Sequence, residues 1–191
     1  MKRVSNLVNV QLLPHNIGYA KRIFELVSAP QIKHALGIKD ESVEDTERFI
    51  HWIIEEERTG KQISRIICDE HGELIGITTL MCIKPQQKLC HIGTWIGHEF
   101  WGRGYNQASK VEILKIAFYE LGMEYVMAGA RQANIRSQRA QEKLPYIRLN
   151  VEKRFPDELQ FLENKERQPC VLHAFYKEDF IAYFSKNNPL D

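Results

Sequence analysis

The amino-acid sequence predicts a single-domain α/β fold, and three observations support that prediction. Seven short segments, apolar or alternating, have the pattern of strands, and helical patterns lie between most of them. At 191 residues the chain is long enough for one domain with a substantial buried core. In residues 96–106 an apolar strand runs into a turn with two glycines and then into a long amphipathic helix, an arrangement that presents backbone N–H groups to an anion.

The first strand is predicted over residues 8–13, where apolar and polar side chains alternate. Asn16 can cap the helix that follows, and Pro30 stops that helix. Residues 31–36 add a short helical turn, which ends at Gly37.

The next helix has the clearest boundaries in the sequence. Ser42 and Asp45 have the spacing of a capping box, and Gly60 supplies the stop. Its polar face carries five glutamates, which we interpret as a solvated surface, with an acidic site for a basic acceptor as the alternative. These residues are Glu44, Glu47, Glu55, Glu56 and Glu57.

The middle of the chain predicts a hairpin followed by the glycine turn. Residues 63–68 and 74–83 are strands joined by the turn at 69–72. Residues 89–96 form the fourth strand and lead directly into the turn. Apolar side chains keep helical spacing over 106–121, so the long helix starts where the turn ends.

The last third of the chain supplies the remaining strands, which are expected over 124–130, 147–151 and 171–176. A helix opens at Asn134 and cannot continue past Pro145. Residues 152–169 are expected to form a long polar connection that is partly helical, and 177–184 a short helix.

Composition argues against several classes of protein. The net charge of +1 leaves no broad basic field for nucleic acid, although four basic residues between 131 and 143 could form a local patch. No apolar run is long enough to span a membrane, and asparagines interrupt the start of the chain where a signal peptide would be apolar. We therefore expect a cytoplasmic protein that binds neither membrane nor nucleic acid.

Four scattered cysteines indicate buried thiols in a reducing compartment better than a disulfide framework. They are Cys68, Cys82, Cys90 and Cys170. None of them forms a pair with the spacing of zinc ligands, so no metal site is predicted.

The glycine turn carries the main chemical signal. Gly102 and Gly104 can adopt positive φ and let a phosphate approach the backbone, and Arg103 adds a fixed positive charge. The dinucleotide fingerprint fails because Gln107 stands where its third glycine belongs, and no P-loop spacing occurs. Taken alone, the two glycines could equally form an ordinary tight turn.

Two sequence blocks together suggest a family. The run W-G-R-G-Y-N from Trp101 to Asn106 is followed, after a helix and a strand, by N-I-R-S-Q-R-A-Q-E-K-L-P-Y from Asn134 to Tyr146. In order and spacing these blocks resemble the GNAT superfamily of N-acetyltransferases, in particular its RimJ/RimL-like branch. The resemblance is clearest over residues 74–146.

The resemblance implies one GNAT-like domain over 1–191, with a mixed central sheet of about seven strands, splayed between strands four and five and flanked by helices. It implies acetyl-CoA as co-substrate without a metal, and direct acetyl transfer to a primary amine in a ternary complex. The acceptor is expected to be a small-molecule amine or a protein N-terminus, and the protein a monomer or a homodimer. The implied cofactor-binding residues are Trp95, Ile96, Trp101, Gly102, Arg103, Gly104, Tyr105, Asn106, Asn134, Ser137 and Arg139.

Catalytic roles follow from the same resemblance. His91 stands where the family often has a glutamate base, and it titrates in a suitable range, although it could equally be a hydrogen-bonded strand histidine. Glu99 is the fallback base, with a positional role favoured. Ser137 would donate a proton to the leaving thiolate and Asn134 would contact pantetheine, or both could simply cap a helix. Arg139 could reach the adenine-side phosphates or lie on the surface.

Departures from the family pattern support an alternative. Gln141 replaces the tyrosine that often protonates the thiolate, and Asn106 replaces a small residue at the helix start. Pro145 and Tyr146 replace the usual Gly-Phe, and Tyr146 is expected to be core more than acid. The alternative function, motivated by His91, Asn106 and Pro145, is a catalytically weak or inactive acyl-CoA-binding regulatory protein of the same fold.

Overall fold

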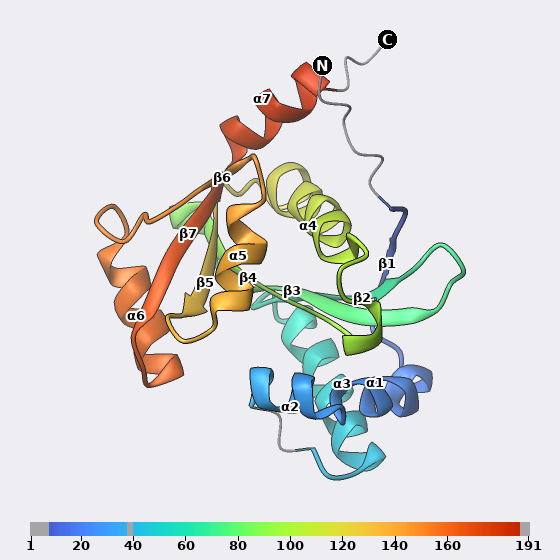
Figure 1. Cartoon of the computed structure of the whole chain (residues 1–191). Helices are drawn as coiled ribbons and strands as arrows, with labels where there is room; N and C mark the ends of the chain where they lie inside the picture. The colour runs from blue at the N-terminus through green and yellow to red at the C-terminus, as the bar shows by residue number, and fades with distance from the viewer. Residues whose placement is uncertain (1–7, 38–39, 188–191) are drawn as a thin grey trace. The chain divides into compact units, whose positions relative to one another are not determined.

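The computed structural model describes residues 8–37 and 40–187, and its alternation of strands and helices confirms the α/β prediction (Figure 1). The strands are β1 (Gln11–Leu13), β2 (Ile63–Cys68), β3 (Leu74–Lys84), β4 (Leu89–Ile96), β5 (Tyr125–Arg131), β6 (Ile147–Arg148) and β7 (Cys170–Tyr176). The α-helices are α1 (Ala20–Val27), α2 (Pro30–Leu36), α3 (Val43–Arg58), α4 (Tyr105–Lys115), α5 (Ile135–Glu142), α6 (Pro156–Glu166) and α7 (Lys177–Asn187). Short 3₁₀ turns are η1 (Ile17–Tyr19), η2 (Pro85–Gln87) and η3 (His98–Phe100), and η4 (Ile116–Glu120) is π-helical.

The strands form one mixed seven-stranded sheet in the order β1-β2-β3-β4-β5-β7-β6. β1, β2 and β3 pair antiparallel, as do β5, β7 and β6, whereas β4 and β5 pair parallel. The β4–β5 ladder runs from Leu89↔Tyr125 to His91↔Met127 and stops there, although β5 continues its ladder with β7 to Arg131. This short ladder of three pairs agrees with the predicted splay of the sheet between strands four and five.

The described chain divides into two compact units. We call residues 8–83 and 93–116 the first unit, and residues 84–92 and 117–187 the second unit. The boundary falls inside β4, after Ile92, so the glycine turn belongs to the first unit and His91 to the second.

The first unit packs α1 beside α3 (Figure 1) over a core shared with β2 and β3. The predicted caps are confirmed: the side chain of Asn16 accepts from Gly18 N, and Ser42 and Asp45 form the full capping box. The amphipathic character predicted for α4 is not observed. Buried residues lie all round this helix, Ser109 and Lys110 among them, so it is not the amphipathic helix that its spacing indicates.

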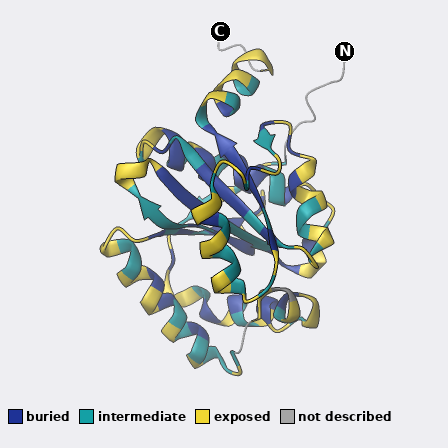
Figure 2. Ribbon diagram, turned by 90° about the vertical axis from the view of Figure 1, so that its left-hand side faces the viewer, coloured by how far each residue is buried: buried dark blue, intermediate teal, exposed yellow. Residues whose placement is uncertain are grey.

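The second unit packs α6 against β5 and β7 (Figure 1). A Cβ on Gly129 of β5 would lie 2.2 Å from Leu162 Cδ2 of α6, so glycine permits this close approach. The strands are largely buried, and the exposed residues lie mainly on helices and loops (Figure 2). Aromatic rings pack where α7 meets the end of β7, at Tyr146, Phe175, Phe180, Tyr183 and Phe184.

Several predicted boundaries were wrong for identifiable reasons. The strand expected over 8–13 keeps sheet pairing only from Gln11, because Val8 and Val10 pack on the core outside the ladder. The strand expected over 147–151 ends at Arg148, since Asn150 takes a φ of 55° and donates its N–H to His173 Nδ1. By contrast, the helical part expected within the polar connection over 152–169 is confirmed as α6, a helix of 11 residues.

Candidate functional site

The glycine turn links β4 to α4 through η3 in the first unit. Gly102 and Gly104 have φ values of 77° and 87°, which confirms the predicted positive-φ conformation. The Trp101 indole Nε1 donates to the Ile96 carbonyl at 2.7 Å and ties the turn to the end of the strand. The guanidinium of Arg103 lies 5.6 Å from the Phe100 ring centroid and is exposed.

This turn presents backbone donors that are not used elsewhere. Among the described residues, the N–H groups from Gly102 to Asn106 find no acceptor. Gly104 is the N-cap of α4 and provides no side-chain cap, so the orphan N–H groups of the first helical turn stay open. A Cβ on Gly102 would meet no atom within 4 Å, which leaves room over the turn. The geometry therefore suits an anion, and specifically a phosphate or pyrophosphate.

Asn106 is held by a buried lysine. Lys110 Nζ donates to Asn106 Oδ1 at 2.8 Å. Because an ammonium only donates, the amide oxygen must face Lys110, and the Nδ2 donors are left for another partner. Burial lowers the pKa of Lys110 to about 8. Asn106 thus lies in the first turn of α4 with its side chain turned to Lys110, and it does not cap the helix.

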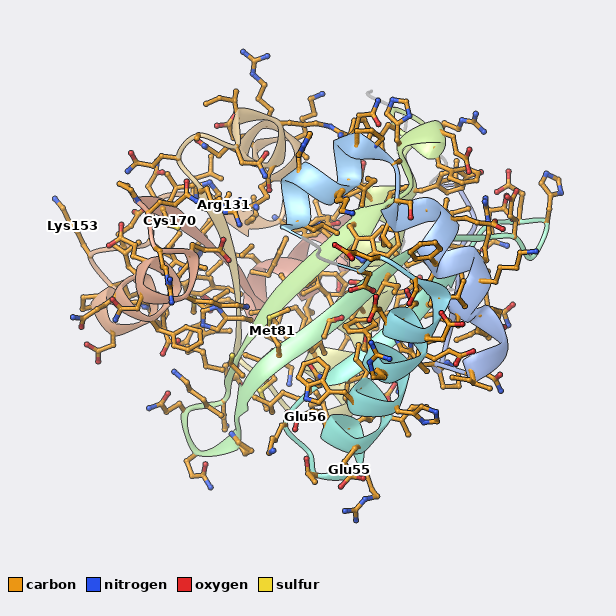
Figure 3. All side chains as sticks on the ribbon, turned by 90° about the horizontal axis from the view of Figure 1, so that it is seen from below. Glu55, Glu56, Met81, Arg131, Lys153 and Cys170 are labelled. Carbon is orange, nitrogen blue, oxygen red and sulfur yellow. The ribbon has the colours of Figure 1, made fainter. Side chains whose placement is uncertain are left out.

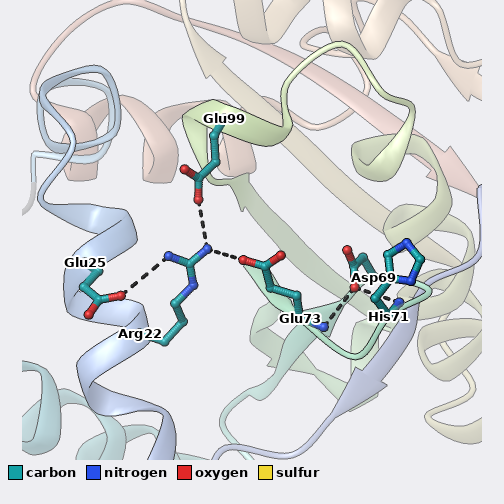
Figure 4. Close-up of polar contacts among 6 residues, drawn as sticks. All are labelled: Arg22, Glu25, Asp69, His71, Glu73 and Glu99. Atoms are coloured by element: carbon teal, nitrogen blue, oxygen red, sulfur yellow. Dashed lines mark hydrogen bonds and ion pairs between the residues drawn. The ribbon is translucent and has the colours of Figure 1, made fainter.

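Glu99 is part of an ion-pair network in the first unit (Figure 4). Arg22 Nη2 lies 2.9 Å from Glu99 Oε1 and 2.6 Å from Glu73 Oε1. Asp69 Oδ1 accepts from the backbone N–H groups of His71 and Glu73, at 2.9 Å each, and shapes the β2–β3 turn. Arg22 therefore bridges α1, this turn and η3, and the contact favours the positional role predicted for Glu99.

The same hairpin turn also contacts the start of α4. The Tyr105 hydroxyl donates to Glu70 Oε2 at 3.0 Å. Burial and this bond to a carboxylate raise the pKa of Tyr105. Tyr105 is therefore a buried structural residue whose side chain anchors the turn, and its backbone N–H makes no hydrogen bond with the described residues.

Trp95 and Ile96 end β4 next to a close backbone approach from β3. A Cβ on Gly76 would lie 2.2 Å from the Trp95 carbonyl oxygen, so only glycine fits there. Gly97 N donates to the Ile75 carbonyl at 2.7 Å and continues the contact. The backbone at Trp95 is therefore rigidly placed, while its side chain is partly buried against the core.

His91 in the second unit has a charged partner that the sequence did not reveal. Its Nε2 lies 2.8 Å from Glu158 Oε2, and Lys84 Nζ lies 2.6 Å from Glu158 Oε1. His91 is 4% exposed and Glu158 6%. Burial lowers the pKa of His91 and outweighs Glu158, whose bond and charge raise it, so the imidazole is neutral at pH 7. The ring meets Phe161 of α6 edge-on, with centroids 5.4 Å apart.

Glu158 lies in the first turn of α6, three residues after the N-cap Phe155. Burial alone would raise its pKa, but the bonds from His91 and Lys84 outweigh burial and lower it. A signal for this helix start exists in the sequence, because Pro156 is followed directly by two acidic residues. Nothing in the sequence pairs Glu158 with a histidine 67 positions away.

Asn134 and Ser137 open α5 in the second unit. Asn134 Oδ1 accepts from Ser137 N at 3.1 Å, so the predicted capping role is confirmed. Ser137 Oγ accepts from Gln141 Nε2 at 3.2 Å, which leaves the serine hydroxyl hydrogen available to donate. Arg139 is exposed.

Tyr146 is only 2% exposed and is surrounded by aromatic rings. Burial raises the pKa of its hydroxyl, so Tyr146 belongs to the core, as predicted.

The candidate residues therefore form two sets. Residues from Trp95 to Asn106 belong to the first unit, and His91, Asn134, Ser137 and Arg139 to the second. Within the described part of the second unit, His91 bonds to Glu158 and makes no hydrogen bond with Asn134 or Ser137.

Three glutamates of the acidic face of α3 and one arginine of the basic patch have local partners of opposite charge. At the end of α3, Glu55 and Glu56 (Figure 3) pair with Arg58 and Lys61 at 2.7 and 2.9 Å. Glu57 pairs with Arg65 at 2.8 Å, so the solvated-face interpretation is favoured over an acidic site. Arg131, in the candidate nucleic-acid patch, pairs with Glu166 at 2.6 Å.

Three general features complete the description. Cys68, Cys90 and Cys170 are buried and Cys82 is partly buried, and none of the four forms a disulfide within the described residues. Within residues 8–37 and 40–187, no group of three His, Cys, Asp or Glu side chains is placed to hold a metal ion. In the same ranges no helix is both long and apolar enough to cross a membrane.

Comparisons with known proteins agree with this geometry. A family model described as "Acetyltransferase (GNAT) domain" matches residues 9–146. A search of curated proteins gave no significant match.

Several solved structures share the fold. Spermidine N-acetyltransferase from Vibrio cholerae, in complex with CoA and spermine, has a TM-score of 0.69 and 13% identity over 90% of this chain and 98% of that chain. The ribosomal L7/L12 alpha-N-protein acetyltransferase RimL, in complex with coenzyme A, has a TM-score of 0.65 and 18% identity over 76% and 82%. The microcin C7 self-immunity acetyltransferase MccE, in complex with acetyl-CoA and AMP, has a TM-score of 0.65 and 19% identity over 73% and 79%.

Proposed function

Because this chain belongs to the acetyltransferase (GNAT) domain family, we propose that it transfers an acetyl group from acetyl-CoA to a primary amine, by direct attack within a ternary complex. The observation that supports this best is the row of unused N–H groups from Gly102 to Asn106 at the start of α4. These donors, the open space over Gly102 and the exposed Arg103 fit the pyrophosphate of a CoA thioester. No metal enters the proposal.

The carbonyl of a bound thioester would lie along the end of β4. We propose that backbone at Trp95 and Ile96 contacts the acyl carrier and that an N–H there faces the developing oxyanion, where one donor contributes about a hundredfold in rate. The close contact of Gly76 with Trp95 supports this role, because it fixes the strand backbone in place. Trp101 holds the Ile96 carbonyl, and Tyr105 is anchored through Glu70.

Proton transfer falls to His91 and Ser137 in this proposal. An alkyl amine with a pKa near 10 is almost wholly protonated at pH 7, so a base must remove its proton, directly or through water. His91 is neutral at that pH and can accept a proton. Ser137 has a free hydroxyl hydrogen for the leaving thiolate, and Asn134 orders the backbone at Ser137. Arg139 is proposed to contact the adenine-side phosphates, and Glu99 to position the turn through Arg22.

The whole chain, residues 1–191, is proposed to act as one domain of the RimJ/RimL-like branch, because the family model matches residues 9–146 and so includes parts of both units. The acceptor is proposed to be a small-molecule amine or a protein N-terminus. Similar folds support both classes, since one solved relative is a spermidine N-acetyltransferase and another acts on the N-terminus of a ribosomal protein. Cytoplasmic location and a monomeric or homodimeric state stay predictions from the sequence.

The first experiment is the thermal shift of the purified protein with acetyl-CoA, desulfo-CoA, ATP and NAD. A ligand that binds only the folded state raises the melting temperature. We expect stabilisation by the two CoA species and none by NAD. An equal shift with ATP, or no shift with any of the four, would contradict the acetyltransferase assignment.

The second candidate function is an acyl-CoA-binding regulatory protein without turnover. It is favoured by Gln141, which occupies the position of the family's tyrosine acid and bonds to Ser137 instead. Release of free thiol from acetyl-CoA, measured with a panel of polyamines, aminoglycosides and short peptides, separates the two functions. Saturable CoA binding without thiol release from any amine would establish the second.

A further inference from the structure

Three charged or titratable side chains from three elements meet in the second unit. His91 comes from β4, Glu158 from the first turn of α6, and Lys84 from the end of β3. Glu158 is the centre, with one carboxylate oxygen 2.8 Å from His91 Nε2 and the other 2.6 Å from Lys84 Nζ. His91 and Glu158 are both almost fully buried, so water does not screen their contact.

We propose that Glu158 is the positioning residue for His91, holding the imidazole with its hydrogen on Nε2 so that Nδ1 is the atom that receives the substrate proton. A carboxylate only accepts hydrogen bonds, so Nε2 must donate. A neutral imidazole carries one N–H, and Nδ1 therefore keeps a lone pair. His91 Nδ1 makes no hydrogen bond with the described residues. It is also not among the fully buried polar atoms without a partner, so it keeps contact with solvent.

Two structural features hold Glu158 in that role. Lys84 occupies the second oxygen, which keeps the carboxylate ionised and prevents it from rotating away from the ring. Gly129 of β5 leaves space for the Leu162 side chain, one turn after Glu158, because a Cβ at Gly129 would lie 2.2 Å from Leu162 Cδ2. The carboxylate also lies at the start of a helix, where the helix dipole favours a negative charge.

The charges around His91 act in opposite directions. Glu158 raises the pKa of the imidazole, whereas burial, Lys84 and Lys165 lower it. Phe161 adds an apolar wall. Removing the carboxylate should therefore lower the pKa of His91, and removing the Lys84 ammonium should raise it.

The inference rests on the proposed function, in which the amine nitrogen forms the new bond to the acetyl carbon and the carbon–sulfur bond breaks. The amine nitrogen loses two protons, one from the ammonium before attack and one as the amide forms, and each passes to His91 Nδ1 and then to solvent. The thiolate takes its proton from Ser137, which solvent reprotonates. The products are an amide and a free thiol, so no oxidant, reductant or further reactant is required.

The test compares Glu158→Gln, Lys84→Met and the control Lys88→Met in the full chain. Lys88 is an exposed lysine near β4 that lies 3.8 Å from Glu124 and does not contact Glu158. Nitrogen-15 NMR of the His91 ring reports the protonated nitrogen and the pKa without any need for activity. The pH dependence of kcat/KM reports the same group during turnover.

We expect the wild-type ring to carry its hydrogen on Nε2. Glu158→Gln should lower the pKa of His91 by about one unit and reduce kcat about tenfold to a hundredfold with little change in KM for acetyl-CoA. Lys84→Met should raise the pKa by about half a unit, and Lys88→Met should leave it unchanged. The pKa that describes the acid limb of the kcat/KM profile should fall in Glu158→Gln and rise in Lys84→Met.

Several results would overturn the inference. A hydrogen on Nδ1 in the wild-type protein would do so, as would equal shifts of the His91 pKa in Glu158→Gln and Lys84→Met. If the NMR results agree with the inference and kcat is unchanged in Glu158→Gln, His91 is not the base and the positioning role is wrong. Failure of the proposed function itself looks different, because then CoA gives no thermal shift and no amine releases thiol.

Discussion

Replacing Lys110 with methionine should stabilise the protein at neutral pH. The Lys110 ammonium is 7% exposed and bonds only to a neutral amide among the described residues, so the folded chain carries a buried charge with weak compensation. Burial lowers the pKa of Lys110 from 10.5 to about 8. At 1.36 kcal/mol per pKa unit, this difference corresponds to about 3 kcal/mol of destabilisation below pH 8. Methionine has a similar length and no charge, so it removes this cost.

The sign of the pH dependence separates this cause from simple repacking. Between pH 8 and 10.5 the unfolded chain binds more protons at Lys110 than the folded chain, so the free energy of unfolding rises with pH in that window. Lys110→Met should therefore gain about 2–3 kcal/mol at pH 7, and the gain should fall towards zero by pH 10.5.

The assay is urea unfolding followed by tryptophan fluorescence at pH 7 and at pH 10.5. Lys115→Met is the matched control, because Lys115 lies on the same helix, is half-exposed and pairs with Glu112. We expect the control to change stability by less than about 0.5 kcal/mol. A Lys110→Met variant that is less stable than wild type at pH 7, or equally stabilised at both pH values, would refute the reasoning.

Four further predictions follow from the same geometry. Gly104→Ala should weaken acetyl-CoA binding at least tenfold in calorimetry and destabilise the fold by about 1–2 kcal/mol in urea unfolding, because φ is 87° at this position. Asparagine tolerates that φ better than alanine, so effects of Gly104→Asn as large as those of Gly104→Ala would contradict the backbone explanation. Gly129→Ala should force Leu162 into another rotamer and destabilise the protein by about 1 kcal/mol in urea unfolding, because a Cβ there would lie 2.2 Å from Leu162 Cδ2; an unchanged stability would refute this. His15 has a pKa lowered to about 4 by burial and then by Arg65, so the free energy of unfolding should fall by about 3 kcal/mol as pH drops from 6.5 to 4; His15→Asn should flatten that slope in urea titrations. Ser137→Ala should lower kcat about tenfold while the CoA thermal shift persists, and unchanged kcat would remove Ser137 from the proton path.

Local signals in the sequence were sufficient for much of the fold. The capping box of Ser42 and Asp45 predicted the start of α3. Clear turns bound the apolar residues of β2 and β4, so those strands have the predicted ends. Gly102 and Gly104 were predicted to take positive φ, and they do. In each case the determining interaction lies within a few residues along the chain.

The residues that escaped prediction depend on distant neighbours. The bounds of α6 within the partly helical connection over 152–169 were not predicted, because the apolar face of this helix is weak. Glu158 becomes a partner of His91 only because the fold brings β4 and α6 together. Lys110 looks like a surface lysine in a helical pattern, and its burial depends on α4 being covered on more than one side.

The glycine turn also determines how this protein can lose its function by mutation. Its donors are main-chain amides, so most substitutions from Gly102 to Asn106 leave the donors in place, and only a changed chain path or a proline removes them. In the proposed function, in contrast, proton transfer depends on single side chains such as His91 and Ser137. Random drift should therefore abolish turnover long before it abolishes ligand binding, and binding-only descendants of such a chain are the expected evolutionary by-product.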